Sequence, residues 1–192
     1  MSTVLKLSIE EYSQMIEQGA FDRLHRRIEL IRGELRETSP AGPIHDDLIT
    51  FLAGWSTSVI DTERIRVRIQ CGLELTEQES RPEPDVLWVT ARRYLDRHPR
   101  ASDVQLAIEV ANSSLRIDLD EKATLYAEAG IIEYWIVDAN AECIHLFREP
   151  QITSGQAKYQ FQQRFELGMQ IAPACMPQAM LNVSELFGKE PS

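Results

Sequence analysis

The sequence predicts an α/β fold with a central mixed β-sheet flanked by helices, folded as one domain over residues 1–192. The first observation behind this prediction is the order of the hydrophobic patterns, which is helix, hairpin, helix, strands, helix and strands. The second is that the apolar runs at 86–89 and 104–110 are short and nearly continuous, as in strands covered on both faces. A hydrophobic content of 43% allows one substantial core.

In the amino-terminal half, the first predicted element is a helix. Ser8 followed by Glu11 has the form of a capping box, and the helix runs to about Gln18. Periodicity predicts three further elements in this half, which are a hairpin over 27–37, a helix over 45–60 and a strand with one wet face over 64–75.

The carboxy-terminal half continues the sheet. The charged stretch 92–99, between the two apolar runs, is expected to form a solvated helix and loop. Asp118 and Glu121 repeat the capping-box pattern and open a predicted helix that ends near Gly130. Three last strands are expected over 132–138, 142–148 and 158–165.

The acidic balance of the chain argues against one class of function. The net charge is −10, from 20 basic and 30 acidic residues, whereas a protein that coats nucleic acid is normally basic. A nuclease is compatible with this charge, because a metal site needs local carboxylates and the bound cation supplies local positive charge.

The sequence shows no feature of export or membrane insertion. It has no apolar run of about 18 residues, and its amino terminus lacks the basic start and apolar stretch of a secretion signal. Cys71, Cys143 and Cys175 are widely spaced and form neither a disulfide framework nor a zinc pattern, and the four histidines form no zinc signature. We therefore expect a cytoplasmic protein with no membrane partner.

Acidic side chains occur in segments whose apolar pattern predicts a hydrophobic core. Asp85 opens the first apolar run, and Glu109 lies between Ile108 and Val110 in the second. A carboxylate in such a strand is costly to bury unless it is paired or binds a metal. Lys122 follows at the start of a helix-like segment, so the three residues suggest a divalent-cation site that handles phosphate esters.

The chemistry of such a site follows from the ligands. If their strands are neighbours, Asp85 and Glu109 could supply the carboxylates that magnesium prefers, with the backbone carbonyl of Val110 as an extra ligand. Lys122 would then hold the scissile phosphate or the attacking water, and Glu29 in the hairpin could add a further carboxylate.

Purely structural interpretations stand beside these roles. Asp85 alone is as readily a capping residue at a strand start, and Lys122 can form an ordinary i,i+4 pair with Asp118. For Glu29, spacing alone favours a surface position in the hairpin. His45 could contact phosphate, but a polar residue at a helix start needs no such role.

Four parts of the chain resemble a known family. They are IELIRGEL (28–35), RPEPDVLWV (81–89), the block 106–139 and the closing strands. Together they resemble the Uma-type (Uma-two) family of restriction-endonuclease-like proteins, within the PD-(D/E)XK nuclease superfamily. The resemblance implies a restriction-endonuclease-like fold and a phosphodiesterase that depends on Mg²⁺ or Mn²⁺ and cleaves nucleic acid, with DNA as the expected substrate.

The resemblance also assigns residues. Asp85 matches the motif aspartate, Glu109 the second acid and Glu29 the acid of the family's amino-terminal hairpin. The lysine expected two residues after Glu109 is replaced by Ala111, and Lys122 resembles the relocated lysine of this family.

Three functions are therefore open at this point. The main hypothesis is a metal-dependent endonuclease, which we expect to pair as a homodimer because two copies are needed to cut both strands of a duplex symmetrically. The missing lysine and the net charge of −10 motivate a second, a non-catalytic nucleic-acid-binding or regulatory module on a nuclease fold. The third is a small-molecule metallohydrolase that uses the same ion site.

Overall fold

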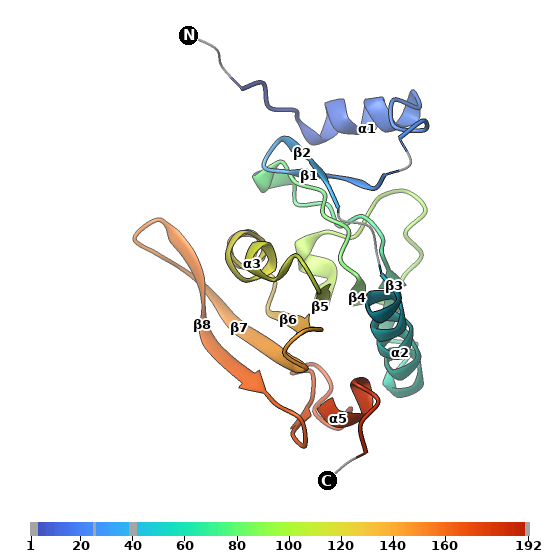
Figure 1. The fold of residues 1–192 in the computed structure, drawn as a ribbon. Helices are drawn as coiled ribbons and strands as arrows, with labels where there is room; N and C mark the ends of the chain where they lie inside the picture. Colours follow the sequence, from blue (N-terminus) through green and yellow to red (C-terminus); the bar gives the residue numbers. More distant parts are fainter. Residues whose placement is uncertain (1–3, 25, 39–41, 191–192) are drawn as a thin grey trace.

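The computed structural model describes residues 4–24, 26–38 and 42–190, built around a mixed six-stranded β-sheet (Figure 1). The strands follow one another across the sheet in chain order, from β3 to β8. Only β5 and β6 pair in parallel, and the other neighbours are antiparallel. The strands are β3 (Ile65–Ile69), β4 (Val86–Thr90), β5 (Val104–Ala111), β6 (Glu133–Asp138), β7 (Cys143–Thr153) and β8 (Gln156–Phe165).

Helices and two short hairpins complete the fold. The parallel step from β5 to β6 is made by a helical segment with α-helical ends and a π-helical centre. The helices are α1 (Ile9–Glu17), α2 (Pro43–Val59), α3 (Leu115–Ile117), the π-helical segment η3 (Asp118–Lys122), α4 (Ala123–Glu128) and α5 (Val183–Leu186). The two small pairs are β1 (Ile28–Ile31) with β2 (Glu34–Glu37), and β9 (Gln170–Ile171) with β10 (Leu181–Asn182).

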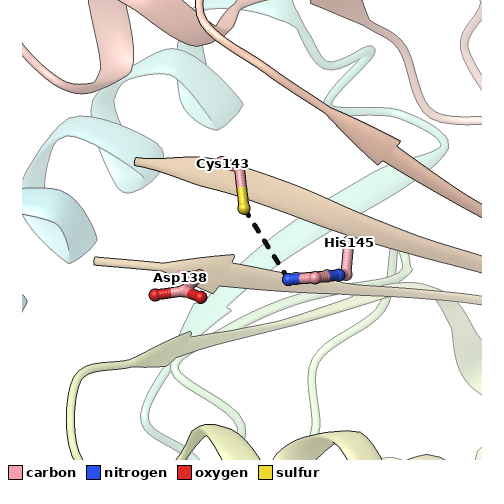
Figure 2. Close-up of side chains that lie close together, drawn as sticks. All are labelled: Asp138, Cys143 and His145. Atoms are coloured by element: carbon pink, nitrogen blue, oxygen red, sulfur yellow. Dashed lines mark hydrogen bonds between the residues drawn. The ribbon is translucent and has the colours of Figure 1, made fainter. Parts of the chain in front are cut away.

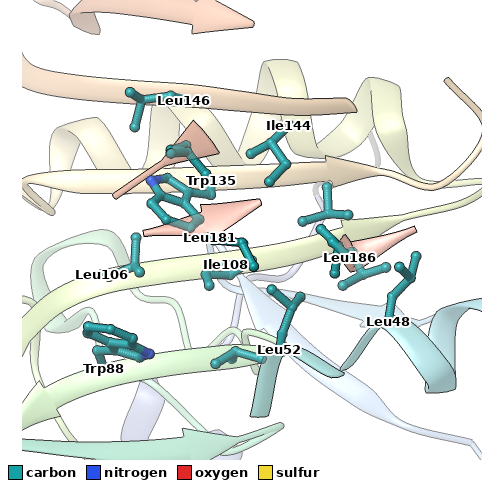
Figure 3. Close-up of a cluster of buried hydrophobic side chains, with 14 of the residues drawn as sticks. Leu48, Leu52, Trp88, Leu106, Ile108, Trp135, Ile144, Leu146, Leu181 and Leu186 are labelled. Atoms are coloured by element: carbon teal, nitrogen blue, oxygen red, sulfur yellow. The ribbon is translucent and has the colours of Figure 1, made fainter. Parts of the chain in front are cut away.

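The sheet separates two apolar cores, because successive side chains of a strand point to opposite faces. Figure 3 shows the first core, in which Trp88, Ile108 and Trp135 pack against residues of α2 and α5. The second core lies under η3 and α4 and contains Tyr126 and Tyr134. Both faces of the central strands are thus covered, which explains their continuous apolar runs and confirms the predicted mixed sheet flanked by helices.

The predicted strand over 64–75 is too long. β3 ends at Ile69, and Gln70 leaves the sheet with a φ of 47°. Its backbone N–H donates a hydrogen bond to the carbonyl oxygen of Asp85 at 3.1 Å. Leu73 and Leu75 continue the alternating apolar pattern of the sequence, although they lie in a loop, because both side chains are buried in the second core.

Two other predicted elements are wrong in detail. The charged stretch 92–99 is an irregular loop with bends and no helix, and a short 3-10 helix follows only at Ala101–Asp103. The helix predicted from Asp118 begins earlier, at Leu115, so that Asp118 lies inside it. Its carboxylate accepts a hydrogen bond from Ser114 Oγ at 2.6 Å and caps no helix start.

Candidate functional site

Neighbouring strands bring Asp85 and Glu109 to the same face of the sheet. β4 and β5 pair so that Val86 lies opposite Ile108, which places Asp85 beside the end of β5. The N–H of Val110 donates a hydrogen bond to Asp85 Oδ2 at 2.9 Å. Ile108 and Val110, the neighbours of Glu109 in the strand, point into the first core. Glu109 therefore points to the other face of the sheet, under η3 and α4.

The helical segment places a lysine and a tyrosine on Glu109. Lys122 Nζ lies 2.9 Å from Glu109 Oε1, and the hydroxyl of Tyr126 donates to the same oxygen at 2.8 Å. Asp118, one turn before Lys122, contributes a carboxylate oxygen 3.9 Å from Nζ. Only 12% of the Lys122 side chain is exposed, so the ammonium is held among carboxylates rather than in solvent.

The β1–β2 hairpin adds Glu29 to this group. Glu29 is buried, so the surface position favoured by its spacing is wrong. Its Oε2 lies 3.7 Å from Lys122 Nζ, and its Oε1 accepts a hydrogen bond from the N–H of Glu83 at 2.7 Å. The hairpin is held there because the N–H of Arg81 donates to the carbonyl of Leu30 at 2.7 Å.

Two side chains fix the carboxylate of Asp85. His45, in the first turn of α2, places Nε2 3.3 Å from Asp85 Oδ2, and Gln70 donates to Oδ1 at 3.1 Å. Burial would raise the pKa of Asp85, but the hydrogen bonds from His45, Gln70 and the Val110 N–H outweigh it and hold that pKa below its usual value. Asp85 therefore remains ionised, and the hydrogen bond to it raises the pKa of His45.

The other carboxylates are harder to ionise. Burial raises the pKa of Glu109 to about 8, although Lys122 opposes the shift, and burial also raises the pKa of Asp118. Burial would lower the pKa of Lys122, but Glu109, Glu29 and Asp118 outweigh it and raise that pKa. Among the described residues, three carboxylates thus contact Lys122 and Asp85 lines the same cavity, an excess of oxygen ligands that fits a hard divalent cation.

The raised pKa of Glu109 predicts that the affinity for a metal ion depends on pH. A cation needs the ionised form of Glu109, whose pKa of about 8 leaves it mostly protonated at pH 6. Binding of Mn²⁺ should therefore release a proton and tighten by up to about tenfold per pH unit until about pH 8, where it should level off. Calorimetric titrations in buffers of different ionisation enthalpy would measure the proton release, and affinity independent of pH between 6 and 8 would contradict the prediction.

These residues border a cavity of about 420 Å³. Its floor carries the four carboxylates and Lys122, together with His45 and Val110. Its rim carries Arg26, Arg27 and Arg36, whose side chains are 40 to 59% exposed and pair with nearby glutamates. A phosphate that bridges a bound cation and these arginines would replace the glutamates in their ion pairs.

A second group of potential ligands lies outside this cavity. Asp138, Cys143 and His145 approach one another at the turn between β6 and β7 (Figure 2). This group could not be predicted from the sequence, because Asp138 and Cys143 meet only when the two strands pair. The available signal was Cys143 and His145 at a spacing of two in a strand, which places both on one face.

The sheet and the buried acids place the chain in the class of restriction-endonuclease-like folds. It superposes on the crystal structure of a putative nuclease belonging to DUF820 from Anabaena variabilis ATCC 29413 with a TM-score of 0.75. The two sequences are 13% identical, and the match covers 95% of this chain and 98% of the other, so it establishes the fold.

The family follows from the sequence itself. The model of the Uma2 family, described as "Putative restriction endonuclease", matches residues 9–184, and the chain belongs to this family. No protein of curated function matches it. Within the described ranges, none of the helices has the length and apolar character needed to cross a membrane.

Proposed function

We propose that this protein is a divalent-metal-dependent endonuclease that hydrolyses phosphodiester bonds in nucleic acid, with DNA as substrate. The observation that carries the proposal is that Glu29 and Glu109 contact Lys122 and that Asp85 lines the same cavity. Membership of the Uma2 family supports a nuclease, and the oxygen-only ligand set supports Mg²⁺ or Mn²⁺.

The proposed ligands come from the two central strands. Asp85 and Glu109 would hold the ion with their carboxylates, and the backbone carbonyl of Val110 would be a further ligand. When bound, the ion supplies Lewis-acid stabilisation of the phosphoryl oxygens and a more acidic water. Asp85 is ready for this role because His45 and Gln70 fix its orientation, and the Tyr126 hydroxyl fixes Glu109 in the same way.

Lys122 has the second proposed role. Its ammonium lies among the carboxylates of Glu29, Glu109 and Asp118, 2.9 Å from Glu109 Oε1. With the carboxylates engaged by the ion, Lys122 would orient the attacking water or stabilise the negative charge that develops on the scissile phosphate. Glu109, and after it Glu29 at 3.7 Å from the ammonium, raise the pKa of Lys122, and Glu29 would help to hold the charged lysine at this position.

The substrate would approach over the arginines at the rim of the cavity. Because the net charge of the chain is −10, general attraction does not bring nucleic acid to it, and Arg26, Arg27 and Arg36 would provide the local contacts to phosphates. We further propose a single-domain, cytoplasmic protein that acts as a homodimer, so that two sites address the two strands of a duplex.

Manganese binding is the direct test of this function. Calorimetry should show binding to the wild type and none to the variant Asp85→Ala/Glu109→Ala, followed by cleavage of plasmid DNA with Mn²⁺ or Mg²⁺ that EDTA abolishes. Glu10→Ala/Glu17→Ala, which removes two exposed acids of α1, is the matched control and should bind and cleave normally.

The competing functions predict other results. Salt-sensitive DNA binding without cleavage at any metal concentration would overturn the endonuclease and support a non-catalytic nucleic-acid-binding module. This alternative is favoured by Ala111, which stands where the superfamily carries its lysine. Hydrolysis of a generic phosphodiester without any cleavage of DNA or RNA would instead identify a small-molecule metallohydrolase.

A further inference from the structure

We propose a second metal site, for zinc or a similar borderline-soft divalent ion, at the turn between β6 and β7. Asp138, Cys143 and His145 supply a carboxylate oxygen, a sulfur and an imidazole nitrogen that all lie within 4.8 Å of one another (Figure 2). Zinc binds this set of ligands in proteins, whereas the cavity around Glu109 offers oxygen ligands to harder ions. The proposal is independent of the endonuclease assignment.

The backbone of the sheet brings the three side chains together. Asp138 and Cys143 are paired residues at the start of the antiparallel β6–β7 ladder, and the turn 139–142 joins them. His145 is two residues further along β7 and therefore lies on the same face as Cys143. Three ligands on two hydrogen-bonded strands need little ordering when an ion binds.

The spacing of the sulfur and nitrogen atoms fits a tetrahedral ion. Cys143 Sγ lies 3.7 Å from His145 Nε2. Tetrahedral zinc with ordinary Zn–S and Zn–N bond lengths holds these two atoms about 3.6 Å apart. The pair could therefore bind one ion without a shift of the strands, and a water would complete the coordination beside Asp138.

Hydrogen bonds from the turn orient the carboxylate of Asp138. Its Oδ1 accepts from the N–H groups of Asn140 at 3.0 Å and Ala141 at 2.9 Å. These bonds hold the carboxylate and leave its Oδ2 available to a metal. Outer hydrogen bonds that fix a ligand in this way are typical of protein metal sites.

Arg164 supports the sulfur ligand from the neighbouring strand. It lies opposite His145 in the β7–β8 ladder, and its Nε donates to Cys143 Sγ at 3.1 Å. Burial raises the pKa of the Cys143 thiol, and this hydrogen bond opposes that shift while it holds the sulfur in place. The charge of Arg164 is balanced by Glu166, whose Oε1 lies 3.1 Å from Arg164 Nε.

Access and burial also fit a structural ion. Cys143 and Asp138 are buried, at 0% and 4% exposure, whereas His145 is half-buried and leaves one side open for entry. A buried carboxylate next to a buried thiol is costly unless it is paired. An ion here would fasten the turn, whose Asn140 side chain donates to the carbonyl of Asn112 at the edge of the catalytic cavity.

Cobalt substitution tests the site by a readout that is independent of nuclease activity. Reduced protein titrated with Co²⁺ should develop a thiolate-to-cobalt charge-transfer band and the strong visible bands of a tetrahedral site, both saturating at one equivalent. Zinc should displace the signal. Cys143→Ser and His145→Asn should each weaken Co²⁺ binding at this site by on the order of 100-fold or more, and Cys143→Ser should abolish the charge-transfer band.

Matched variants separate this site from the rest of the protein. Cys175→Ser removes a different thiol, and Glu109→Gln alters only the oxygen-ligand cavity, so both should keep the band unchanged. The proposal is overturned if reduced wild type shows no charge-transfer band, or if the band survives in Cys143→Ser. If Cys143→Ser does not fold, zinc competition against a chromophoric chelator with His145→Asn decides the question, and unchanged zinc affinity in that variant would also overturn the site.

Discussion

Glu109→Gln should lower the rate of metal-dependent cleavage by on the order of 10³-fold, because metal stabilisation of the transition state is worth several kcal/mol. The amide keeps the size of the side chain and an oxygen that can accept from Tyr126 and Lys122, which both bond to Glu109 Oε1. It removes the negative charge that a cation requires. The loss should therefore appear in chemistry and metal affinity rather than in folding.

The decisive measurement is single-turnover cleavage of plasmid DNA at saturating Mn²⁺, together with thermal unfolding of the same sample in EDTA. The melting temperature should be equal to or above that of the wild type, since one of four clustered carboxylates loses its charge. Glu10→Gln on the exposed face of α1 is the control and should cleave at the wild-type rate. Full cleavage by Glu109→Gln would refute the assignment of this residue.

Lys122→Met should destabilise the metal-free protein by about 3 kcal/mol, since removing one partner of a buried ion pair leaves the other uncompensated. The ammonium contacts Glu109, Glu29 and Asp118, and no other lysine or arginine in the described part of the chain forms an ion pair with these three carboxylates. Methionine fills a similar volume, so the effect should be electrostatic rather than a cavity. Saturating Mn²⁺ should restore much of the loss, because the ion replaces the missing positive charge.

The destabilisation caused by Lys122→Met should increase with pH. Burial raises the pKa values of Glu109 and Asp118 in the folded protein, and the loss of Lys122 raises them further. Groups whose pKa is higher in the folded than in the unfolded state favour folding at low pH and lose this contribution as pH rises. Chemical denaturation should thus show a small difference at pH 5 and a large one at pH 8.

A lysine on the surface provides the comparison. Lys158→Met, on an exposed position of β8, should change the free energy of unfolding by no more than about 0.5 kcal/mol at either pH. A loss in Lys122→Met that is equally large at pH 5 and pH 8, or that Mn²⁺ leaves unchanged, would show that packing rather than charge is responsible.

The sequence was sufficient to predict the sheet and the position of two acids. The continuous runs 86–89 and 104–110 are central strands because both of their faces are covered, and an acid inside such a run is buried. Glu109 was recognisable for this reason, and Asp85 because it opens the first run. Whether they act in catalysis stays a prediction that the cleavage and binding measurements decide.

Other residues of the candidate site could not be predicted, because contacts between distant segments of the chain bring them together. Glu29 looks like a surface residue of a hairpin, and its burial comes from the docking of β1 on the segment before Asp85. His45 and Gln70 reach Asp85 only after α2 and the end of β3 are in place. The start of the helix at Leu115 was missed because the pattern of Asp118 and Glu121 imitates a cap, although Asp118 bonds back to Ser114.

The order of the strands also bears on how the molecule folds. Every strand of the central sheet lies beside its neighbour in the chain, and the connections 139–142 and 154–155 are short, which favours early pairing of β6, β7 and β8. Asp85, Glu109 and Lys122 all belong to one uninterrupted stretch of this ladder and its crossover helix. Glu29 and His45 come from earlier segments that must dock on it. Asp85, Glu109 and Lys122 can therefore come together before Glu29 and His45 dock on them. Destabilising the β1–β2 hairpin would loosen the site while leaving the sheet intact.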